Sequence, residues 1–157
     1  MFEKAKGTLD HPVNHYVRLI TYDSLQRNIF GCDPIPSNTY YLASKDSAKS
    51  VFDGNVVTIY FNRGIYFIIV KTGCYYCIYS GIEKTNLIIG EPVKQGQYLG
   101  IVAENNFHEY TLQFMIATKD GYIDPDAWFR RCCCSQQISC TESENNAANF
   151  NTILRCR

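Results

Sequence analysis

The 157-residue sequence lacks the features that define several large classes of protein. Its 15 Lys and Arg balance its 15 Asp and Glu, so no basic field attracts nucleic acid or anionic lipid. No apolar run is long enough to span a membrane. The first residues, Met1 to Gly7, are charged and contain no apolar signal region. We therefore expect no nucleic-acid partner and no membrane span, in either a cytosolic protein or a fragment whose targeting segment has been removed.

The apolar spacing of an amphipathic helix is also missing from the whole sequence. Short runs of β-branched and aromatic residues alternate instead with Gly, Pro, Asn and Asp, which is typical of strands and turns. Hydrophobic residues make up 46% of the chain and charged residues 19%, so we expect one domain with a real core, closed by Trp128 and Phe129. The sequence predicts an all-β fold. Its expected strands are Val13–Tyr22, Tyr40–Leu42, Val56–Phe61, Tyr98–Val102 and Tyr110–Thr118.

The segment Ile65–Ile82 is expected to form the central hairpin of an antiparallel sheet. Two apolar runs flank Lys71-Thr72-Gly73, which is short and ends in glycine, as hairpin turns do. Within Tyr66–Val70 both alternating sets of side chains are apolar. We therefore expect this strand to be covered on both sides, with Phe67 and Ile69 on one covered face.

The eight cysteines leave more than one interpretation open. An even number suits disulfides in an exported protein, but the sequence does not choose among the pairings. Cys74 and Cys77 have the spacing of a redox or zinc CxxC motif, yet no second CxxC completes a four-ligand site. We expect both to lie inside a strand, on opposite faces, and to pack as small hydrophobic residues. Cys132 to Cys134 follow two arginines, as in some lipidation sites, but a polar tail or a disulfide-tied flap is the preferred interpretation.

Histidine is scarce, and its distribution limits the chemistry that the chain can perform. The three histidines are His11, His15 and His108, and none lies between the last two. His11 and His15 are four residues apart, which suits a helix, but Pro12 favours an extended chain. We expect all three to be ordinary surface or loop residues. No motif places a histidine beside a cysteine for nucleophilic catalysis.

Five segments, in order and at matching spacing, resemble the motifs of LytM/lysostaphin-type domains, which are zinc metallopeptidases. These segments are Leu9–Val13, Ser50–Val56, Gly73–Ile82, Gly90–Gly100, and Leu112–Ile116 with Gly121–Trp128. The resemblance implies antiparallel sheets in a LytM-like β-barrel or sandwich, the duplicated hybrid motif, over residues 8–129. Residues 1–7 are then an N-terminal remnant or linker, and residues 130–157 a cysteine-rich polar tail.

The same comparison implies that the metal site of this family is missing. Thr111 and Gln113 stand where the family has its His-x-His pair, and Gly81 stands where it has the histidine of its tyrosine-alanine-histidine-leucine motif. The family's His-x-x-x-Asp motif is absent, because no histidine precedes Asp53 after His15. Imidazoles and a carboxylate hold zinc and leave a position for water, whereas amide and hydroxyl oxygens are poor zinc donors. The resemblance therefore implies no catalytic residue, no metal site and no cofactor.

The function implied by the resemblance is that of a catalytically inactive domain similar to murein hydrolase activators of the EnvC and NlpD type. Such a domain would bind peptidoglycan or a cell-wall hydrolase (an amidase) in the periplasm or cell envelope. The family's substrate groove would remain as an aromatic-lined cleft suited to a peptide, a glycan or a partner segment. Because side chains alternate along a strand, only about half of the tyrosines can face it. The candidate lining residues are Tyr75, Tyr76, Tyr79, Gly81, Thr111 and Gln113.

Two other hypotheses stay open at this point. The first is a divergent zinc metalloendopeptidase that acts on peptidoglycan peptides through a rebuilt metal site. The second is a carrier domain of the biotinyl or lipoyl type, which presents a modifiable lysine at a hairpin tip. Lys71 lies at the expected turn, but its neighbours do not resemble the carrier motif.

Overall fold

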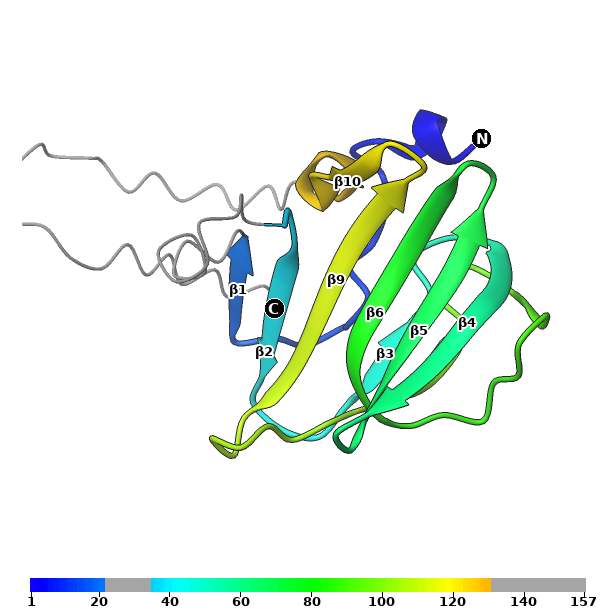
Figure 1. Ribbon diagram of the computed structural model, residues 1–157. Helices are drawn as coiled ribbons and strands as arrows, with labels where there is room; N and C mark the ends of the chain where they lie inside the picture. Colours follow the sequence, from blue (N-terminus) through cyan, green and yellow to red (C-terminus); the bar gives the residue numbers. More distant parts are fainter. Residues whose placement is uncertain (22–34, 131–157) are drawn as a thin grey trace, which may run out of the picture.

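The computed structural model describes residues 1–21 and 35–130, and within them the chain is built almost entirely of strands (Figure 1). Two 3-10 helices accompany them, η1 (Phe2–Ala5) and η2 (Pro125–Trp128). Neither of these helices, in the described part of the chain, is long and apolar enough to cross a membrane. The strands are β1 (Arg18–Thr21), β2 (Asn38–Leu42), β3 (Ser47–Lys49), β4 (Gly54–Asn62), β5 (Ile65–Thr72), β6 (Tyr75–Lys84), β7 (Pro92–Val93), β8 (Tyr98–Val102), β9 (Tyr110–Thr118) and β10 (Gly121–Ile123).

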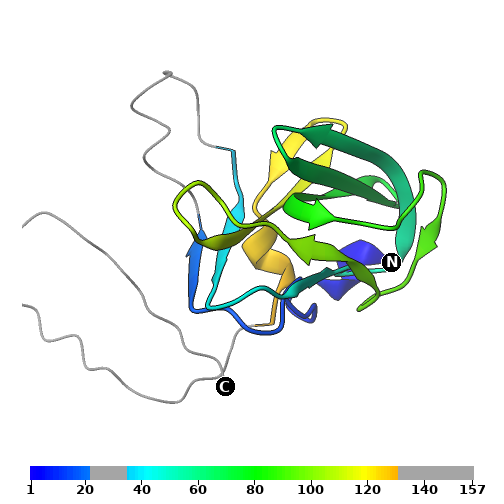
Figure 2. The ribbon, with the colours of Figure 1, turned by 90° about the horizontal axis from the view of Figure 1, so that it is seen from below.

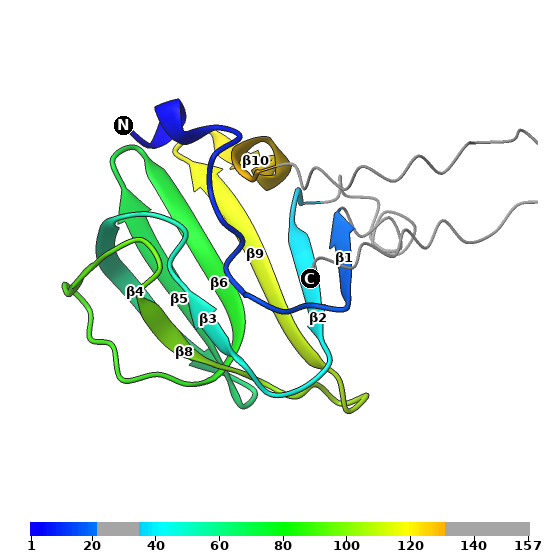
Figure 3. The same cartoon turned by 180° about the vertical axis from the view of Figure 1, so that it is seen from behind.

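The strands form a curved antiparallel sheet in the order β1-β2-β9-β6-β5-β4-β7. Strand β10 pairs with β9, β8 pairs with the end of β6, and β3 pairs with β8. The view from behind shows β3, β8 and the N-terminal segment lying across one face of the sheet (Figure 3). Seen from below, β3 and β8 lie on one side of the curved sheet (Figure 2). The all-β, antiparallel expectation is therefore confirmed.

The core lies between the large sheet and this second layer. The alternation of each strand places one set of side chains inward, and the inward set is nearly free of solvent exposure. Trp128 and Phe129 are also buried, as expected. The largest fully buried side chains are Tyr40, Tyr79, Phe114, Leu9, Ile68, Ile82, Leu99, Leu112, Ile116, Val56, Val70 and Val93.

The central strand β5 is covered on one face only, so the expectation of two covered faces is wrong. Ile68 and Val70 face the core and are 0% and 1% exposed, whereas Phe67 and Ile69 remain half-buried on the opposite face. The second layer packs against only one side of the sheet. The apolar run therefore indicates that the strand lies at the centre of the sheet. It does not indicate that both faces of the strand are buried.

The hairpin between β5 and β6 turns at Gly73 and Cys74, two residues later than the expected start of the turn. Gly73 has φ +61° at the first position of a two-residue loop, where a type II′ turn requires a glycine. Lys71 belongs to strand β5, with its Nζ 5.7 Å from the centre of the Tyr76 ring. It is not the tip residue that a carrier domain would need.

The turn also separates the two cysteines of the CxxC motif. Cys74 is exposed in the loop, whereas Cys77 is buried in strand β6, and both are free thiols. Burial raises the pKa of the Cys77 thiol to about 12, so this side chain packs as a small hydrophobic residue, as predicted. The expectation that both lie inside the strand is wrong. The other six cysteines lie outside the described residues.

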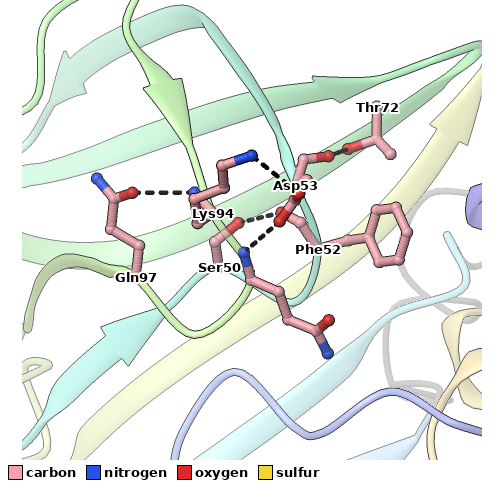
Figure 4. A network of polar contacts seen from close by, with 7 residues as sticks. Ser50, Phe52, Asp53, Thr72, Lys94 and Gln97 are labelled. Atoms are coloured by element: carbon pink, nitrogen blue, oxygen red, sulfur yellow. Dashed lines mark hydrogen bonds and ion pairs between the residues drawn. The ribbon is translucent and has the colours of Figure 1, made fainter.

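Two of the segments that resemble the family motifs meet at Asp53 (Figure 4). Its carboxylate accepts hydrogen bonds from the Gln95 backbone N–H at 2.8 Å and from Lys94 Nζ at 3.3 Å. These two donors, the backbone N–H first, lower the pKa of Asp53. The Asp53 carbonyl accepts a bond from Thr72 Oγ1 at 2.9 Å. The turn after β3 is thereby tied both to β5 and to the loop before β8.

The first and last described segments lie side by side. Phe2 is 3% exposed and stacks on Trp128, with ring centres 5.6 Å apart. Leu9 forms a parallel bridge with Phe129, its N–H bonds the Trp128 carbonyl, and Arg130 N bonds the Leu9 carbonyl. Residues 1–9 therefore pack on the domain. The boundary between residues 7 and 8 stays a prediction, as does the tail, of which only residue 130 is described.

Candidate functional site

The face of the large sheet that turns away from the core is the surface that the resemblance singles out. We call it the outer face. In the view of Figure 1, no element among residues 1–21 and 35–130 lies in front of strands β9, β6, β5 and β4. The registers of the strand pairs place its residues opposite one another. They are Thr39 and Tyr41 on β2, Thr111, Gln113 and Met115 on β9, Tyr76, Ile78 and Ser80 on β6, Phe67 and Ile69 on β5, and Thr58 and Tyr60 on β4.

Gln113 lies at the centre of the polar end of the outer face. It pairs with Thr39 on one neighbouring strand and with Ser80 on the other. Its Nε2 donates a hydrogen bond to Ser37 Oγ at 3.3 Å, across 76 positions of sequence. Serine, threonine and glutamine surround this position, and none of them is a metal ligand of the kind that zinc sites use. This end of the face offers hydrogen-bond donors and acceptors, not metal donors.

Of the three candidate tyrosines, only Tyr76 lies on the outer face. Tyr79 is 0% exposed, and its hydroxyl accepts a hydrogen bond from the Val51 N–H at 2.9 Å in the core. Tyr75 packs on the core side against Phe2, with ring centres 5.1 Å apart. We correct the predicted lining accordingly: Tyr75 and Tyr79 point inward because they share the parity of the buried Cys77.

Gly81 lies where strand β6 leaves one partner and joins another. Up to Ser80 the strand pairs with β9, and from Ile82 it pairs with β8. Gly81 has φ +95°, and a Cβ at this position would collide with the Thr111 carbonyl oxygen. Strands that cross from one sheet to another bend in this way. Gly81 therefore shapes the outer face through its backbone and contributes no side chain to it.

Among the described residues, no three His, Cys, Asp or Glu side chains come together in a way that could hold a metal ion. Two of the histidines instead make contacts with single carboxylates. His15 Nδ1 lies 3.7 Å from Asp46, and His108 Nδ1 lies 2.8 Å from Glu104. Both imidazoles are exposed, as expected of loop histidines. Neither lies on the outer face.

The third histidine, His11, also lies outside the strands, but its side chain is half-buried and has aromatic neighbours. It stacks on Phe129 with ring centres 4.4 Å apart, and its Nδ1 lies 2.7 Å from the Tyr40 hydroxyl. The chain bends at Pro12, so it is not extended there as the sequence predicted, and the His11 ring lies at the margin of the core. Burial lowers the pKa of His11, and the nearby carboxylates Asp126 and Asp10 oppose that shift only in part.

An open pocket of about 980 Å³ lies beside His11, on the inner side of β1, and includes Tyr16, Leu19 and Phe129 in its wall. The cations at its rim already have partners. Lys6 Nζ lies 3.6 Å from Glu3, and Arg130 Nε lies 3.5 Å from Asp10. We therefore regard the pocket as part of the packing of the N-terminal segment, and the outer face as the candidate functional site.

His11 makes the stability of the domain depend on pH. Because its pKa is lowered on folding from 6.5, the unfolded chain binds the proton more readily than the folded one. Its contribution is therefore fully present above pH 6.5 and is lost as the pH falls toward the folded pKa. We expect the stability advantage of the wild type over His11→Asn, measured by urea unfolding, to be larger at about pH 7.5 than at about pH 5.5.

Asparagine at position 11 keeps a hydrogen-bonding atom near the place of Nδ1 but does not titrate, so the packing it loses is the same at both pH values. If the free energies of unfolding of the wild type and His11→Asn differ by the same amount at both pH values, the pH dependence does not come from His11.

Comparison of the sequence with known families and proteins finds no match: no protein-family model and no curated protein is similar enough. Comparison of the structure does find relatives. A complex of SpoIIIAH and SpoIIQ contains a chain that superposes with a TM-score of 0.61 at 14% identity, over 75% of this chain and 97% of that one. The catalytic domain of the M23 protein EnpA from Enterococcus faecalis gives 0.58 at 16% identity, over 72% and 91%.

A third similar structure is larger than this chain. Csd3 from Helicobacter pylori superposes with a TM-score of 0.59 at 22% identity, and the match covers 78% of this chain but 33% of Csd3. In a second structure of the SpoIIQ–SpoIIIAH complex the match covers 59% of this chain and 63% of the matched chain. At these identities the similarity concerns the fold alone. The chain has the fold of LytM/M23 peptidase domains.

Proposed function

We propose that this chain is a catalytically inactive LytM-like domain that acts in peptidoglycan remodelling by binding a murein hydrolase, an amidase. The observation that carries the proposal is the environment of Gln113. Its neighbours on the sheet are Thr39 and Ser80, and its amide bonds Ser37. A zinc hydrolase needs imidazole or carboxylate ligands at its centre, and this face presents hydroxyl and amide groups.

The chemistry of the outer face supports a role in binding. Its polar end, around Gln113 and Thr111, offers hydrogen bonds. Strand β5 adds the half-buried Phe67, in the same row as Gln113, and Ile69, while the ring of Tyr76 lies farther along β6. Aromatic residues beside amide and hydroxyl groups are typical of surfaces that bind peptides and partner proteins. The retained fold holds these groups on strands, in fixed positions.

The structural relatives support the same proposal. SpoIIQ and SpoIIIAH were solved as a complex with each other, described as a pore-forming complex, so a chain of this fold is found in contact with a protein partner. A place outside the cytoplasm, in the periplasm or cell envelope, follows from the proposed work on peptidoglycan.

The proposal predicts retention on a wall amidase without cleavage of the wall. In a pull-down with immobilised amidase, the purified chain is expected to be retained, and a parallel zymogram with peptidoglycan is expected to show no clearing. Thr111→Arg places a bulky charge at the polar end of the outer face, so it should lower retention about tenfold or more. Tyr98→Arg is the matched control, since Tyr98 is an exposed residue of strand β8, which lies across the other face of the sheet (Figure 3).

A second column that carries purified sacculi shows whether the chain binds the amidase or peptidoglycan. Retention on sacculi alone would move the proposal from a hydrolase to peptidoglycan itself, and retention on neither would overturn it. A clearing zone that a chelator abolishes, together with stoichiometric zinc in the purified protein, would instead establish a divergent zinc metalloendopeptidase. That alternative has support in the fold that this chain shares with peptidases such as EnpA.

A further inference from the structure

Strand β4 forms an open edge of the sheet along most of its length (Figure 1). Its pairing with β7 covers only Gly54 and Asn55, and the adjacent Val56 exchanges backbone hydrogen bonds with Glu91 and Gly90. From Val57 to Asn62, no second strand among the described residues pairs with β4 on this side. An edge of this kind presents unpaired N–H and C=O groups to any strand that approaches.

The register of the hairpin shows which backbone groups are free. Asn62 and Ile65 flank the two-residue turn, so Asn62, Tyr60 and Thr58 direct their N–H and C=O toward β5. Ile59 and Phe61 therefore direct theirs away from the sheet. The register shifts at Val57, where β4 has an extra residue, so the alternation changes there. The backbone groups of Val56 therefore point outward, and their bonds to Gly90 and Glu91 agree with that direction.

The side chains of β4 are uncharged, and several large apolar ones along this edge are exposed. Of ten exposed large hydrophobic residues in the described part of the chain, four lie here: Tyr60, Phe61, Ile88 and Ile89. Strand β4 itself, Gly54–Asn62, contains no charged residue and no proline. Proteins that remain monomeric usually protect such an edge with lysine, proline or a covering segment. A bulge is another such device, and β4 has one at Val57. From Thr58 to Asn62, none of these devices is present in the part of the chain that the structure describes.

We propose that this edge pairs with the same edge of a second copy of the chain, antiparallel and across a two-fold axis at Tyr60. In that register Ile59 of each copy faces Phe61 of the other, and the outward N–H and C=O groups of both residues are satisfied. The two Tyr60 side chains then form a close pair on the outer face, because non-hydrogen-bonded partners lie about 4.5 Å apart between Cα atoms. Aromatic pairs across strands stabilise such contacts.

The length of the free edge favours a second copy as its occupant. The free stretch runs from Val57 to Asn62 and ends where Gly90 and Glu91 cover Val56. With the axis at Tyr60, strand β4 of the second copy ends in its turn at Arg63 and Gly64. That turn then lies beside Val56 of the first copy, where the free edge ends. Since β4 has no charge, no repulsion opposes the pairing. The pairing does not depend on the proposed hydrolase partner, because it uses an edge and leaves Gln113 free.

The test is the mass of the protein in solution as a function of concentration, measured by sedimentation and by light scattering. We expect a reversible monomer–dimer equilibrium. Tyr60→Lys places two like charges opposite each other and should raise the dimer dissociation constant at least about tenfold. Tyr60→Thr, which keeps a strand-forming residue without charge, should have a smaller effect. Tyr98→Lys is the control, at an exposed tyrosine on strand β8.

The register has its own test. Photo-oxidative cross-linking of the wild type should join two copies through a dityrosine between their Tyr60 residues, identified by mass spectrometry of the peptides. A protein that is monomeric at all concentrations, or a dimer that Tyr60→Lys does not weaken, would overturn the proposal. Loss of amidase retention in Tyr60→Lys, in a protein that never dimerises, would also overturn the proposal and would place Tyr60 in the partner-binding surface of the outer face.

Discussion

Replacing Gly81 with alanine is expected to lower the free energy of unfolding by about 3 kcal/mol or more. Two costs add at this position. Gly81 has φ +95°, which an alanine adopts only under strain, and the new Cβ would collide with the Thr111 carbonyl oxygen in the neighbouring strand. Neither obstacle can move freely, because the Gly81 carbonyl is itself bonded to Ala103 N at 2.8 Å. Equilibrium unfolding in urea, by fluorescence and circular dichroism, measures the change.

Gly64→Ala is the control that separates the two costs. Gly64 also has a positive φ, +86°, but nothing lies within 4 Å of the place of its Cβ. Gly64→Ala should therefore lower the free energy of unfolding only by the cost of backbone strain, about 1 kcal/mol. If Gly81→Ala lowers the free energy of unfolding no more than Gly64→Ala does, the close approach of β6 to β9 does not contribute to the loss of stability.

The same geometry bears on the histidine that the family has at this position. A Gly81→His variant would carry the strain and the collision of the alanine variant before its imidazole could do anything. The histidine that the resemblance assigns to the hydrolytic step cannot be regained here without these two costs, because the backbone at the crossing of β6 leaves no room for a Cβ.

The second large effect is expected at neighbouring residues of strand β5. Ile68→Ala should cost about 2–5 kcal/mol of stability, since Ile68 is 0% exposed and its removal leaves a cavity in a filled core. Ile69→Ala should cost only about 1 kcal/mol, because Ile69 lies half-buried on the outer face. Both variants remove the same atoms from the same strand, so they share any change in strand propensity.

Thermal and urea unfolding of the two variants, side by side, give the comparison. Equal losses would mean that the outer face is covered as fully as the core. In that case the outer face would not be available as a binding surface, and the proposed function would lose its surface as well.

The strands could be predicted from the sequence because their signals are local. Val56–Phe61 and Tyr110–Thr118 contain the β-branched and aromatic residues that strands favour, and turn residues bound them. The turn at Gly73 and Cys74 was misplaced because one glycine permits several registers. The structure selects the loop that gives Gly73 its positive φ.

The candidate site was only partly predictable, for a different physical reason. Alternation says that about half the tyrosines of β6 face outward, but the sequence does not say which half. Parity with the buried Cys77 decides against Tyr75 and Tyr79. The contact between Gln113 and Ser37 joins residues 76 positions apart, and no local pattern announces it. The stacking of His11 on Phe129 is equally long-range.

The parallel contact between the first and last described segments has a mechanical consequence. Gly7 N bonds the Ala127 carbonyl, Leu9 N bonds the Trp128 carbonyl, and Arg130 N bonds the Leu9 carbonyl. Because the two segments run in the same direction, a pull on Gly7 toward the start of the chain and on Arg130 toward its end slides them past each other. The three bonds then share the load and must fail together, whereas an antiparallel hairpin pulled at its two ends opens one bond at a time. A domain held in this way resists tension applied to its two ends, because all three hydrogen bonds carry the load at the same time.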